Sequence, residues 1–334
     1  MILSHHPTAR KILLRTIRLA TWILALFVLA PSLLVRATPE GTWLYRAEKG
    51  LRLYVALPRL IIVRHPACPL SETVGRIGRE YMSENHTFEQ EAAFILVSDH
   101  QFSNVHTPLG EFWIPARDLR TLFEMVDEQQ RAIYEHGAVR VRPGDIVLDC
   151  GANVGVTVRA ELARGAGLVV AIEPASAPLD CLRRNLASEL QQGKVIIYPR
   201  GVWDRDAELE LTNAPNSAST TASVAIQLGQ PVEKIRLTTI DRIVQELHLQ
   251  RVDFIKMDIE GSEGPALQGA LHTVAAFHPR MAISLEHRPT DPDTLPALVH
   301  RLWPGYETIC GPCEWQGTAV QPNVMFAQFV APPR

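Results

Sequence analysis

The chain has 334 residues, of which 46% are hydrophobic and 21% are charged, and its formal net charge is −3 at pH 7. This length and apolar content suffice for the core of one large domain or two smaller ones. The charge argues against a protein that is basic throughout and binds nucleic acid by neutralising phosphates, so we expect no nucleic-acid partner.

The first 37 residues are predicted to be a basic leader followed by a membrane-anchor helix. Residues 19–35 form an uncharged apolar run of seventeen residues, which is near the lower limit for a membrane-spanning helix. Both the leader and the run are longer than those of a typical signal peptide, so we favour an uncleaved single-pass anchor over a cleaved signal. Positive charge flanks both ends of the run, and its orientation therefore does not follow from charge.

Residues 38–135 are predicted to form an N-terminal cap region. Within it, residues 107–116 are typical of a turn and a short strand. Residues 118–137 have the periodicity of an amphipathic helix that ends at Gly137. Its expected buried side consists of Leu119, Leu122, Phe123, Val126, Ile133 and Tyr134.

Residues 136–334 alternate between predicted strands and helices. Strands are expected at 145–151, 168–174, 195–203, 235–241, 252–260 and 280–287, followed by two terminal strands. Helices are expected between them, at 156–165, 176–193, 242–249, 262–277 and 293–303. Strands that are apolar almost throughout indicate an α/β domain with a doubly wound, mostly parallel sheet covered on both faces.

The cysteines carry a weaker signal. Their number, five, is odd, and the chain is too long to need a disulfide framework, which favours a reducing compartment. Two of them form CGPC at 310–313, the sequence of a thioredoxin-type redox pair. Such a pair opens a helix after an early strand, whereas this one lies near the C-terminus, so we expect a turn between two strands.

A glycine-rich loop follows the strand at 145–151. Asp149, Gly151, Asn153 and Gly155 let the backbone approach a ligand closely, and the next strand ends at Glu173, whose carboxylate can accept hydrogen bonds from ribose hydroxyls. A nicotinamide cofactor site would have GxGxxG with glycine closing the strand. An acid at that position suits a ligand with a cationic end and a ribose, which indicates S-adenosylmethionine.

The strand predicted at 252–260 carries a charge at every second position. Lys256, Asp258 and Glu260 share one of its faces. Unpaired charges are costly inside a sheet, so these side chains either form salt bridges or emerge into a cleft. The strand at 280–287 ends in Glu286 and His287. If the two strands pair, these side chains reach the same cleft as Asp258 and Glu260.

We take His287, Glu286 and Asp258 as candidate catalytic residues, because an imidazole or carboxylate beside a cofactor can remove a hydroxyl proton. Lys256 and Glu260 are counted as candidate cofactor residues, with a salt bridge to Asp258 or Glu260 as the alternative for Lys256. A surface position is the alternative for His287. The same oxygens could hold a divalent cation, although we assign no metal ligand.

The chain resembles the FkbM family of S-adenosylmethionine-dependent methyltransferases. The resemblance rests on DCGANVG, IEP, LTTID, DFIKMDIEGSE and LEH, in this order, and extends from about residue 107 to 327. It implies a seven-stranded Rossmann-like sheet with the last strand antiparallel. It also implies methyl transfer to a hydroxyl of a sugar, a polyketide or another secondary metabolite.

The resemblance also implies how the cofactor is held. Asp149, Gly151, Asn153 and Gly155 would line its methionine end, and Glu173 would bind its ribose.

By the same resemblance, Val202, Trp203 and Asp204 would lie beside the adenine, and Asp258 and Glu260 on the acceptor side. Trp203 replaces the small residue usual at its position.

We therefore predict a membrane-tethered O-methyltransferase that acts on a small-molecule or glycan acceptor. Because the cofactor is made in the cytosol, the catalytic domain should face the cytoplasm. Two alternatives stay open. One is a nicotinamide-dependent Rossmann oxidoreductase, against which Asp149 and the displaced third glycine argue. The other is a non-catalytic, membrane-anchored binding or scaffold protein, which would have no need of the charged row.

Overall fold

The computed structural model describes residues 65–69, 95–99, 101–212, 232–316 and 319–330. The predicted leader and anchor, residues 1–37, and most of the predicted cap region lie outside these ranges. Within them, no helix has the length and apolar character needed to cross a membrane. The chain divides into two compact units, and the site described below belongs to the unit that contains residues 65–68, 86–316 and 321–334.

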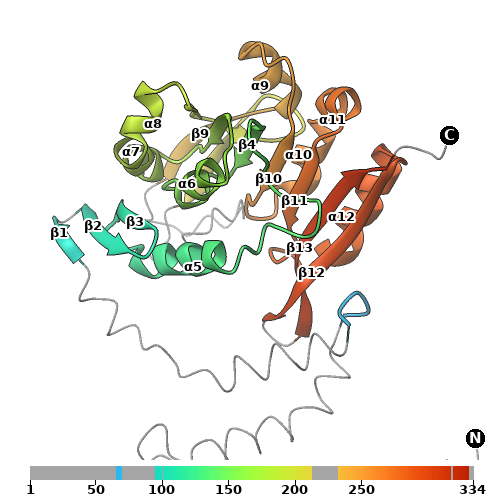
Figure 1. Cartoon of the computed structure of the whole chain (residues 1–334), viewed down its shortest axis with the longest axis horizontal. Coiled ribbons are helices and arrows are strands. Elements are labelled where there is room, and N and C mark those ends of the chain that lie inside the picture. Colours follow the sequence, from blue (N-terminus) through green and yellow to red (C-terminus); the bar gives the residue numbers. More distant parts are fainter. Residues whose placement is uncertain (1–64, 70–94, 100, 213–231, 317–318, 331–334) are drawn as a thin grey trace, which may run out of the picture. The chain divides into compact units, whose positions relative to one another are not determined.

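A seven-stranded sheet forms the centre of this unit (Figure 1). Its strand order is β12 (Tyr306–Gln316), β13 (Ala319–Phe329), β11 (Arg280–Ser284), β10 (Phe254–Met257), β4 (Ile146–Cys150), β5 (Leu168–Ile172) and β6 (Val195–Tyr198). β11, β10, β4, β5 and β6 pair in parallel, and β13 runs antiparallel to β11. The predicted mostly parallel sheet with an antiparallel last strand is therefore confirmed.

Helices cover both faces of the sheet because its strands are apolar on both sides. Alternate residues of β4 divide between the faces, so that Leu148 belongs to one buried cluster and Val147 to the other. The first cluster includes side chains of α9 (Ile240–Glu246), α10 (Glu263–Gln268), α11 (Leu271–Phe277) and α12 (Asp291–Leu302). The second includes side chains of α6 (Val156–Ala163) and α7 (Ser176–Asn185).

Two predicted helices are each interrupted. Residues 176–193 form α7 and α8 (Ala187–Gln191), with a break at Leu186. Residues 262–277 form α10 and α11, with a break that includes Gly269. A Cβ at Gly269 would lie 2.1 Å from the carbonyl oxygen of Trp203, so only glycine permits this close approach of two backbone segments.

Several predicted strands were wrong in extent or in sheet. The strand predicted at 252–260, for example, ends at Met257, so Asp258 and Glu260 lie in the turn after it. Residues 195–203 form β6 and then β7 (Gly201–Val202), which leaves the main sheet. β7 pairs with β9 (Val232–Thr238), and β9 pairs with β8 (Ala207–Thr212), a strand that the sequence did not reveal. The strand predicted at 235–241 ends at Thr238, because Thr239 caps α9 by accepting a hydrogen bond from the Arg242 N–H at 3.0 Å.

A small antiparallel sheet precedes the main one, formed by β1 (Ile95–Ser98), β2 (Phe102–Thr107) and β3 (Gly110–Pro115). The Asn185 side chain of α7 ties this sheet to the core. Its amide accepts from the Trp113 N–H at 2.7 Å and donates to the carbonyl oxygens of Trp113 and Val154.

The helix predicted at 118–137 ends earlier, as α5 (Leu119–Gln130). The chain leaves the helical conformation soon afterwards, at Ala132, whose φ is 52°. Gly137 therefore does not end the helix. The predicted apolar side is nonetheless correct, since Leu122 and Val126 are buried and pack with Val154 of the glycine loop.

The cysteines pair differently from expectation. Cys68 and Cys313 form a disulfide, and Cys150, Cys181 and Cys310 are free. β12 runs through CGPC, so the turn predicted there was wrong. A disulfide is also untypical of the reducing compartment that the odd cysteine count favoured. The two partners are 245 residues apart in sequence, and their spacing could not reveal the pairing.

Candidate functional site

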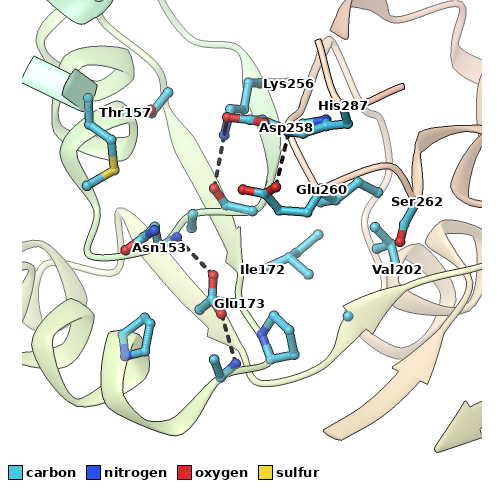
Figure 2. A pocket seen from close by; sticks show the side chains of 18 of the residues that line it. Asn153, Thr157, Ile172, Glu173, Val202, Lys256, Asp258, Glu260, Ser262 and His287 are labelled. Carbon is cyan, nitrogen blue, oxygen red and sulfur yellow. Dashed lines mark hydrogen bonds and ion pairs between the residues drawn. The ribbon is translucent and has the colours of Figure 1, made fainter. Parts of the chain in front are cut away.

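A cavity of about 470 Å³ opens at the carboxyl ends of the parallel strands, where ligands bind in doubly wound sheets (Figure 2). The loops after β4, β5, β10 and β11 and one side of α5 supply its walls. Ten of the predicted site residues line it: Gly151, Asn153, Glu173, Val202, Trp203, Lys256, Asp258, Glu260, Glu286 and His287. Three other described residues from the prediction, Asp149, Gly155 and Asp204, are not among its lining residues.

The loop after β4 brings backbone to the edge of the cavity. Gly151 has a φ of 84°, and a Cβ there would lie 1.9 Å from the carbonyl oxygen of Asp258, so no other residue fits. Gly155 has a φ of 92° and precedes α6, where a Cβ would lie 2.8 Å from Leu182 of α7. Gly155 thus serves the packing of two helices, whereas Gly151 lies at the cavity.

Glu173 follows β5 and is held by the glycine loop. One of its carboxylate oxygens accepts from the Asn153 N–H at 3.1 Å, and the other from the Ala175 N–H at 2.8 Å. Burial raises the pKa of Glu173 to about 7, against the two backbone hydrogen bonds, which lower it. Each carboxylate oxygen can accept a second hydrogen bond, so Glu173 can bind two neighbouring hydroxyl groups while its own position is fixed.

The cavity wall near β7 and β9 is largely apolar, which suits a flat, weakly polar ligand group. Trp203 also lines this side, and its backbone N–H donates to the carbonyl oxygen of Thr238 at 2.7 Å. Asp204 instead pairs with Arg205 at 2.9 Å. The apolar residues here are Val202, Leu209, Ile235 and Leu237.

Lys256 and Asp149 form a buried ion pair at the base of the cavity. The two residues are register partners on β10 and β4, and the Lys256 Nζ lies 3.2 Å from an Asp149 oxygen. Their side chains are 3% and 0% exposed. The Lys256 Nζ also donates to the carbonyl oxygen of Gly151 at 2.9 Å. The salt bridge considered for Lys256 therefore exists, but its nearest partner is Asp149, since the closest Asp258 oxygen lies 3.9 Å away.

The charges of this pair shift each other's titration. Burial lowers the pKa of Lys256, but the charges of Asp149 and Asp258 outweigh burial and raise it above its ordinary value. Burial raises the pKa of Asp149 although Lys256 opposes that shift. Asp149 therefore acts as the counter-ion of the lysine that supports Gly151.

His287 lies among three carboxylates, as the predicted pairing of β10 with β11 implies. Its Nε2 is 3.3 Å from an Asp258 oxygen and 3.5 Å from a Glu260 oxygen, and its Nδ1 is 3.0 Å from a Glu263 oxygen. Burial lowers the pKa of His287, but the contact with Glu263 and the charges of Asp258 and Glu260 raise it to about 10 overall. The side chain is therefore an imidazolium at neutral pH.

The turn after β10 is shaped by these contacts. Glu260 has a φ of 58°, a left-handed conformation that is uncommon for glutamate, and Gly261 follows with a φ of 87°. The buried carboxylate of Glu263 accepts from the Ile259 N–H at 2.9 Å and holds the turn from inside. Glu263 was not among the predicted site residues, although a carboxylate in the first turn of a helix is a recognisable signal.

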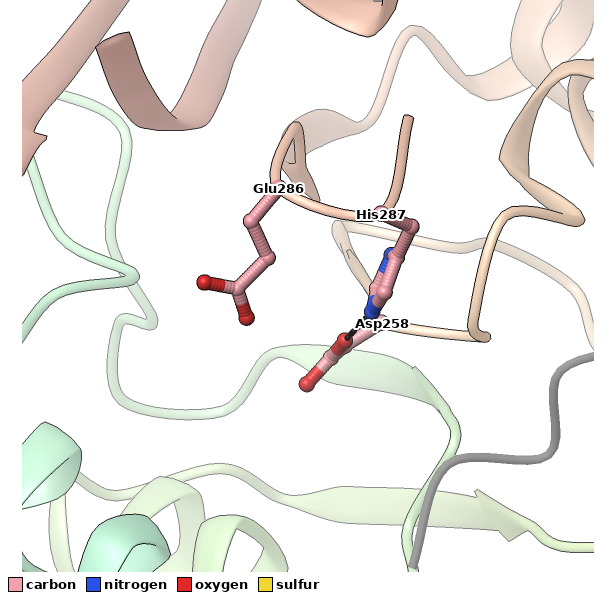
Figure 3. Close-up of side chains that lie close together, drawn as sticks. All are labelled: Asp258, Glu286 and His287. Atoms are coloured by element: carbon pink, nitrogen blue, oxygen red, sulfur yellow. Dashed lines mark ion pairs between the residues drawn. The ribbon is translucent and has the colours of Figure 1, made fainter. Parts of the chain in front are cut away.

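Asp258, Glu286 and His287 offer oxygen and nitrogen atoms that all lie within 4.8 Å of one another (Figure 3). Such a group could hold a cation if its atoms were free. The His287 Nε2, however, already pairs with Asp258, and an imidazolium has no lone pair for a metal. The Asp258 carboxylate also accepts from the Tyr134 O–H at 2.9 Å. The donor set thus fits an ion-paired cluster better than a metal site.

One side of α5 also faces the cavity, although none of its residues was predicted to belong to the site. Its lining residues recur every three to four positions, as one face of a helix requires. In the sequence, the periodicity of this helix indicates only its buried apolar side. The polar and charged residues on the cavity side are Arg120, Thr121, Glu124 and Glu128, with Met125 between them.

Comparison with known proteins finds a match that includes most of the residues lining this cavity. Residues 149–303 match the family model described as the methyltransferase FkbM domain. The matched segment begins at the end of β4 and ends after α12, so α5 lies outside it. A curated relative, 31-O-demethyl-FK506 methyltransferase FkbM of Streptomyces tacrolimicus, is 29% identical over 167 residues. This alignment covers 42% of the present chain and 64% of the relative, so the chain spans less than two thirds of that protein.

Two solved structures are similar to parts of this chain. Methyltransferase FkbM from Methylobacillus flagellatus is 18% identical with a TM-score of 0.46, and the match covers 85% of this chain and 62% of that one. TYW2 from M. jannaschii, solved in complex with AdoMet, is 13% identical with a TM-score of 0.40, covering 70% and 88%. Both TM-scores are below 0.5, so neither structure bears on the function of this chain.

Proposed function

We propose that this chain, which carries a methyltransferase domain of the FkbM family at residues 149–303, transfers a methyl group from S-adenosylmethionine to a hydroxyl oxygen of a small-molecule or glycan acceptor. The observation that carries the proposal is the position of Glu173 and Gly151. Both line one cavity at the carboxyl ends of β4 and β5, and both lie within the matched domain. The name of this relative gives 31-O-demethyl-FK506 as its substrate, which supports a hydroxyl acceptor for the present chain without identifying it.

The residues of the cavity fit S-adenosylmethionine. Glu173 keeps free acceptor capacity on both oxygens, which suits the two hydroxyls of a ribose. The apolar wall next to β7 and β9 suits an adenine ring. Gly151 and Asn153 of the glycine loop line the cavity next to Glu173, where the methionine end would lie. The carboxylates of Asp258 and Glu260 favour a ligand with positive charge.

Asp149 has a different role in this proposal from the one that the resemblance implies. It is fully buried and pairs with Lys256, which in turn donates to the Gly151 carbonyl. Asp149 therefore supports the loop indirectly. Gly155 likewise acts through helix packing, and Asp204 lies away from the cavity lining.

Bound S-adenosylmethionine supplies an electrophilic methyl group on a sulfonium, so the remaining work of the protein is to position an acceptor oxygen and to remove its proton. The imidazolium of His287 has no lone pair to accept that proton. We infer that His287 instead fixes the orientation of Asp258 and Glu260, with which it forms ion pairs. Burial and the charge of Asp258 raise the pKa of Glu286 to about 7. Its carboxylate is therefore available as a proton acceptor at the edge of the same cavity.

Transfer of radiolabelled methyl groups tests the proposal. The full-length protein is incubated with methyl-labelled S-adenosylmethionine and a panel of neutral sugars and hydroxylated secondary metabolites. Label in a product that survives mild alkali supports an ether, and hence hydroxyl methylation. Alkali-labile label would indicate a carboxyl acceptor and contradict the proposal. Tight binding of NADH without binding of S-adenosylmethionine would favour the oxidoreductase alternative.

A further inference from the structure

The proton acceptor of the proposed reaction can be sought among the carboxylates that line the cavity. Most of them already have partners. Glu124 accepts from Arg120 at 2.7 Å, Glu173 binds two backbone N–H groups, and Asp258 and Glu260 pair with His287. Within the described part of the chain, the carboxylates of Glu128 and Glu286 have no hydrogen bond or ion pair.

Glu128 and Glu286 differ in their surroundings. Glu286 is the more exposed of the two and lies in the loop after β11, whereas Glu128 is half-buried and lies in the last turn of α5. A base on a helix that packs firmly is held more accurately than one in an exposed loop.

The position of α5 is fixed from its opposite side. Leu122 and Val126 are buried against Val154, and the Gln129 side chain donates to the Thr157 hydroxyl of α6 at 3.2 Å. These contacts hold the helix against the glycine loop and α6. Glu128, the residue before Gln129, is thereby directed to the cavity.

We propose that Glu128 is the catalytic base of the methyl transfer, a residue supplied by a helix outside the matched methyltransferase domain. The inference rests on the proposed function. The acceptor's oxygen forms the new C–O bond as the C–S bond of the sulfonium breaks and its electron pair stays on sulfur. The hydroxyl proton of the acceptor goes to the Glu128 carboxylate, so charge and atoms balance.

The electrostatic surroundings of Glu128 suit this role. Burial and the charges of Asp258 and Glu286 raise its pKa, Lys256 and Arg131 oppose the shift, and the pKa is about 8 overall. Arg120 and Glu124 lie on the same side of α5, but they pair with each other. A base works best when its pKa lies near the working pH. A sulfonium nearby would lower the pKa of Glu128 and prepare the carboxylate form.

Proton release on ligand binding tests this assignment without a known acceptor. S-adenosylmethionine carries the sulfonium charge, and S-adenosylhomocysteine does not. Calorimetric titration of the full-length protein at pH 7.5, in buffers of different ionisation enthalpy, gives the number of protons released with each ligand. An opposite charge nearby lowers a carboxyl pKa by about one unit or more, so S-adenosylmethionine should release about half a proton more than S-adenosylhomocysteine.

Substitutions identify the group that releases the proton. Glu128→Gln should lower the excess by about that half proton and leave the affinity for S-adenosylhomocysteine within about threefold. Asp127→Asn is the matched control, because Asp127 neighbours Glu128 but pairs with Arg131 on the outside of the helix, and it should keep the excess. Equal release with both ligands, or an excess that Glu128→Gln keeps and Glu286→Gln removes, would overturn the assignment.

Failure of the inference and failure of the proposed function give different results. If both ligands bind without a difference in proton release, only the role of Glu128 falls. If neither ligand binds to the folded protein, the proposed function falls with it. With an acceptor from the panel in hand, Glu128→Gln should lower kcat by about 100-fold or more and abolish its rise with pH, while Asp127→Asn should not.

Discussion

Replacing Lys256 by methionine should destabilise the protein by about 3–5 kcal/mol, because it leaves the Asp149 carboxylate buried without a counter-charge. At the observed separation of 3.2 Å, two unit charges attract by about 5 kcal/mol for an effective dielectric constant of about 20. Asp149 is fully buried and cannot regain contact with water. Only protonation of Asp149 can otherwise remove its uncompensated charge, and this limits the loss of folding free energy.

The loss should depend on pH in a defined direction. Burial raises the pKa of Asp149 in the folded state, and without Lys256 that pKa rises further. Between the unfolded and the folded pKa, the folded state binds a proton that the unfolded state does not. The stability of Lys256→Met should therefore recover as the pH falls through this window and worsen as the pH rises through it.

Urea unfolding of the full-length protein, followed by tryptophan fluorescence, measures these free energies. In a double-mutant cycle, Asp149→Asn combined with Lys256→Met should be more stable than Lys256→Met alone, with a coupling energy of about 2 kcal/mol or more. A cost below about 1 kcal/mol for Lys256→Met, or additive effects of the two substitutions, would refute the buried pair.

Four further outcomes are expected. The loss of stability caused by His287→Gln should be largest below about pH 6.5 and should shrink as the pH rises towards about 10, because the pKa of His287 in the folded state is raised to about 10. A loss of stability that does not depend on pH would contradict a protonated His287. Thiol titration in denaturant without reductant should find three thiols, Cys150, Cys181 and Cys310, whereas five would exclude the disulfide. EDTA should leave the affinity for S-adenosylhomocysteine unchanged, since Asp258 and His287 are already paired; a marked loss would indicate a bound cation. The full-length chain should resist extraction from membranes by alkaline carbonate if residues 19–35 are an anchor, and a freely soluble protein would contradict that prediction.

Patterns local in the sequence predicted the main sheet well. Strands such as 168–174 are apolar on both sides and are followed by amphipathic helices, which is sufficient to indicate a parallel sheet with two covered faces. β8 was missed although AELELT alternates between apolar and charged residues, as a half-exposed strand does, because its partner β9 follows only after a long intervening segment. The early end of α5 depends on the conformation of Ala132, which its residue type does not indicate.

The candidate site was likewise predictable from the sequence only in part. Gly151, Glu173, Asp258 and His287 could be found because each lies at the end of a predicted strand, and parallel strands bring such ends together. The partners of these residues could not be assigned. Two examples are the choice of Asp149 by Lys256, which follows from the β4–β10 register, and the approach of α5, which depends on tertiary packing.

The charge state of His287 shows why a residue's role needs the structure. At a strand end, its sequence context favours a general base. Three carboxylates around the ring, one of them buried on α10, reverse that expectation by stabilising the protonated form. Glu263 contributes to this only through the fold of the turn after β10.

Calorimetric titration of the full-length protein with S-adenosylhomocysteine, comparing wild type with Glu173→Gln, tests the central claim most directly. Glu210→Gln, an exposed carboxylate on β8 away from the cavity, is the control. We predict micromolar binding that falls at least about tenfold in Glu173→Gln, equivalent to about 1.4 kcal/mol, and is unchanged in Glu210→Gln. Absence of binding to folded wild-type protein, or binding that Glu173→Gln leaves intact, would contradict the assignment of this cavity to S-adenosylmethionine.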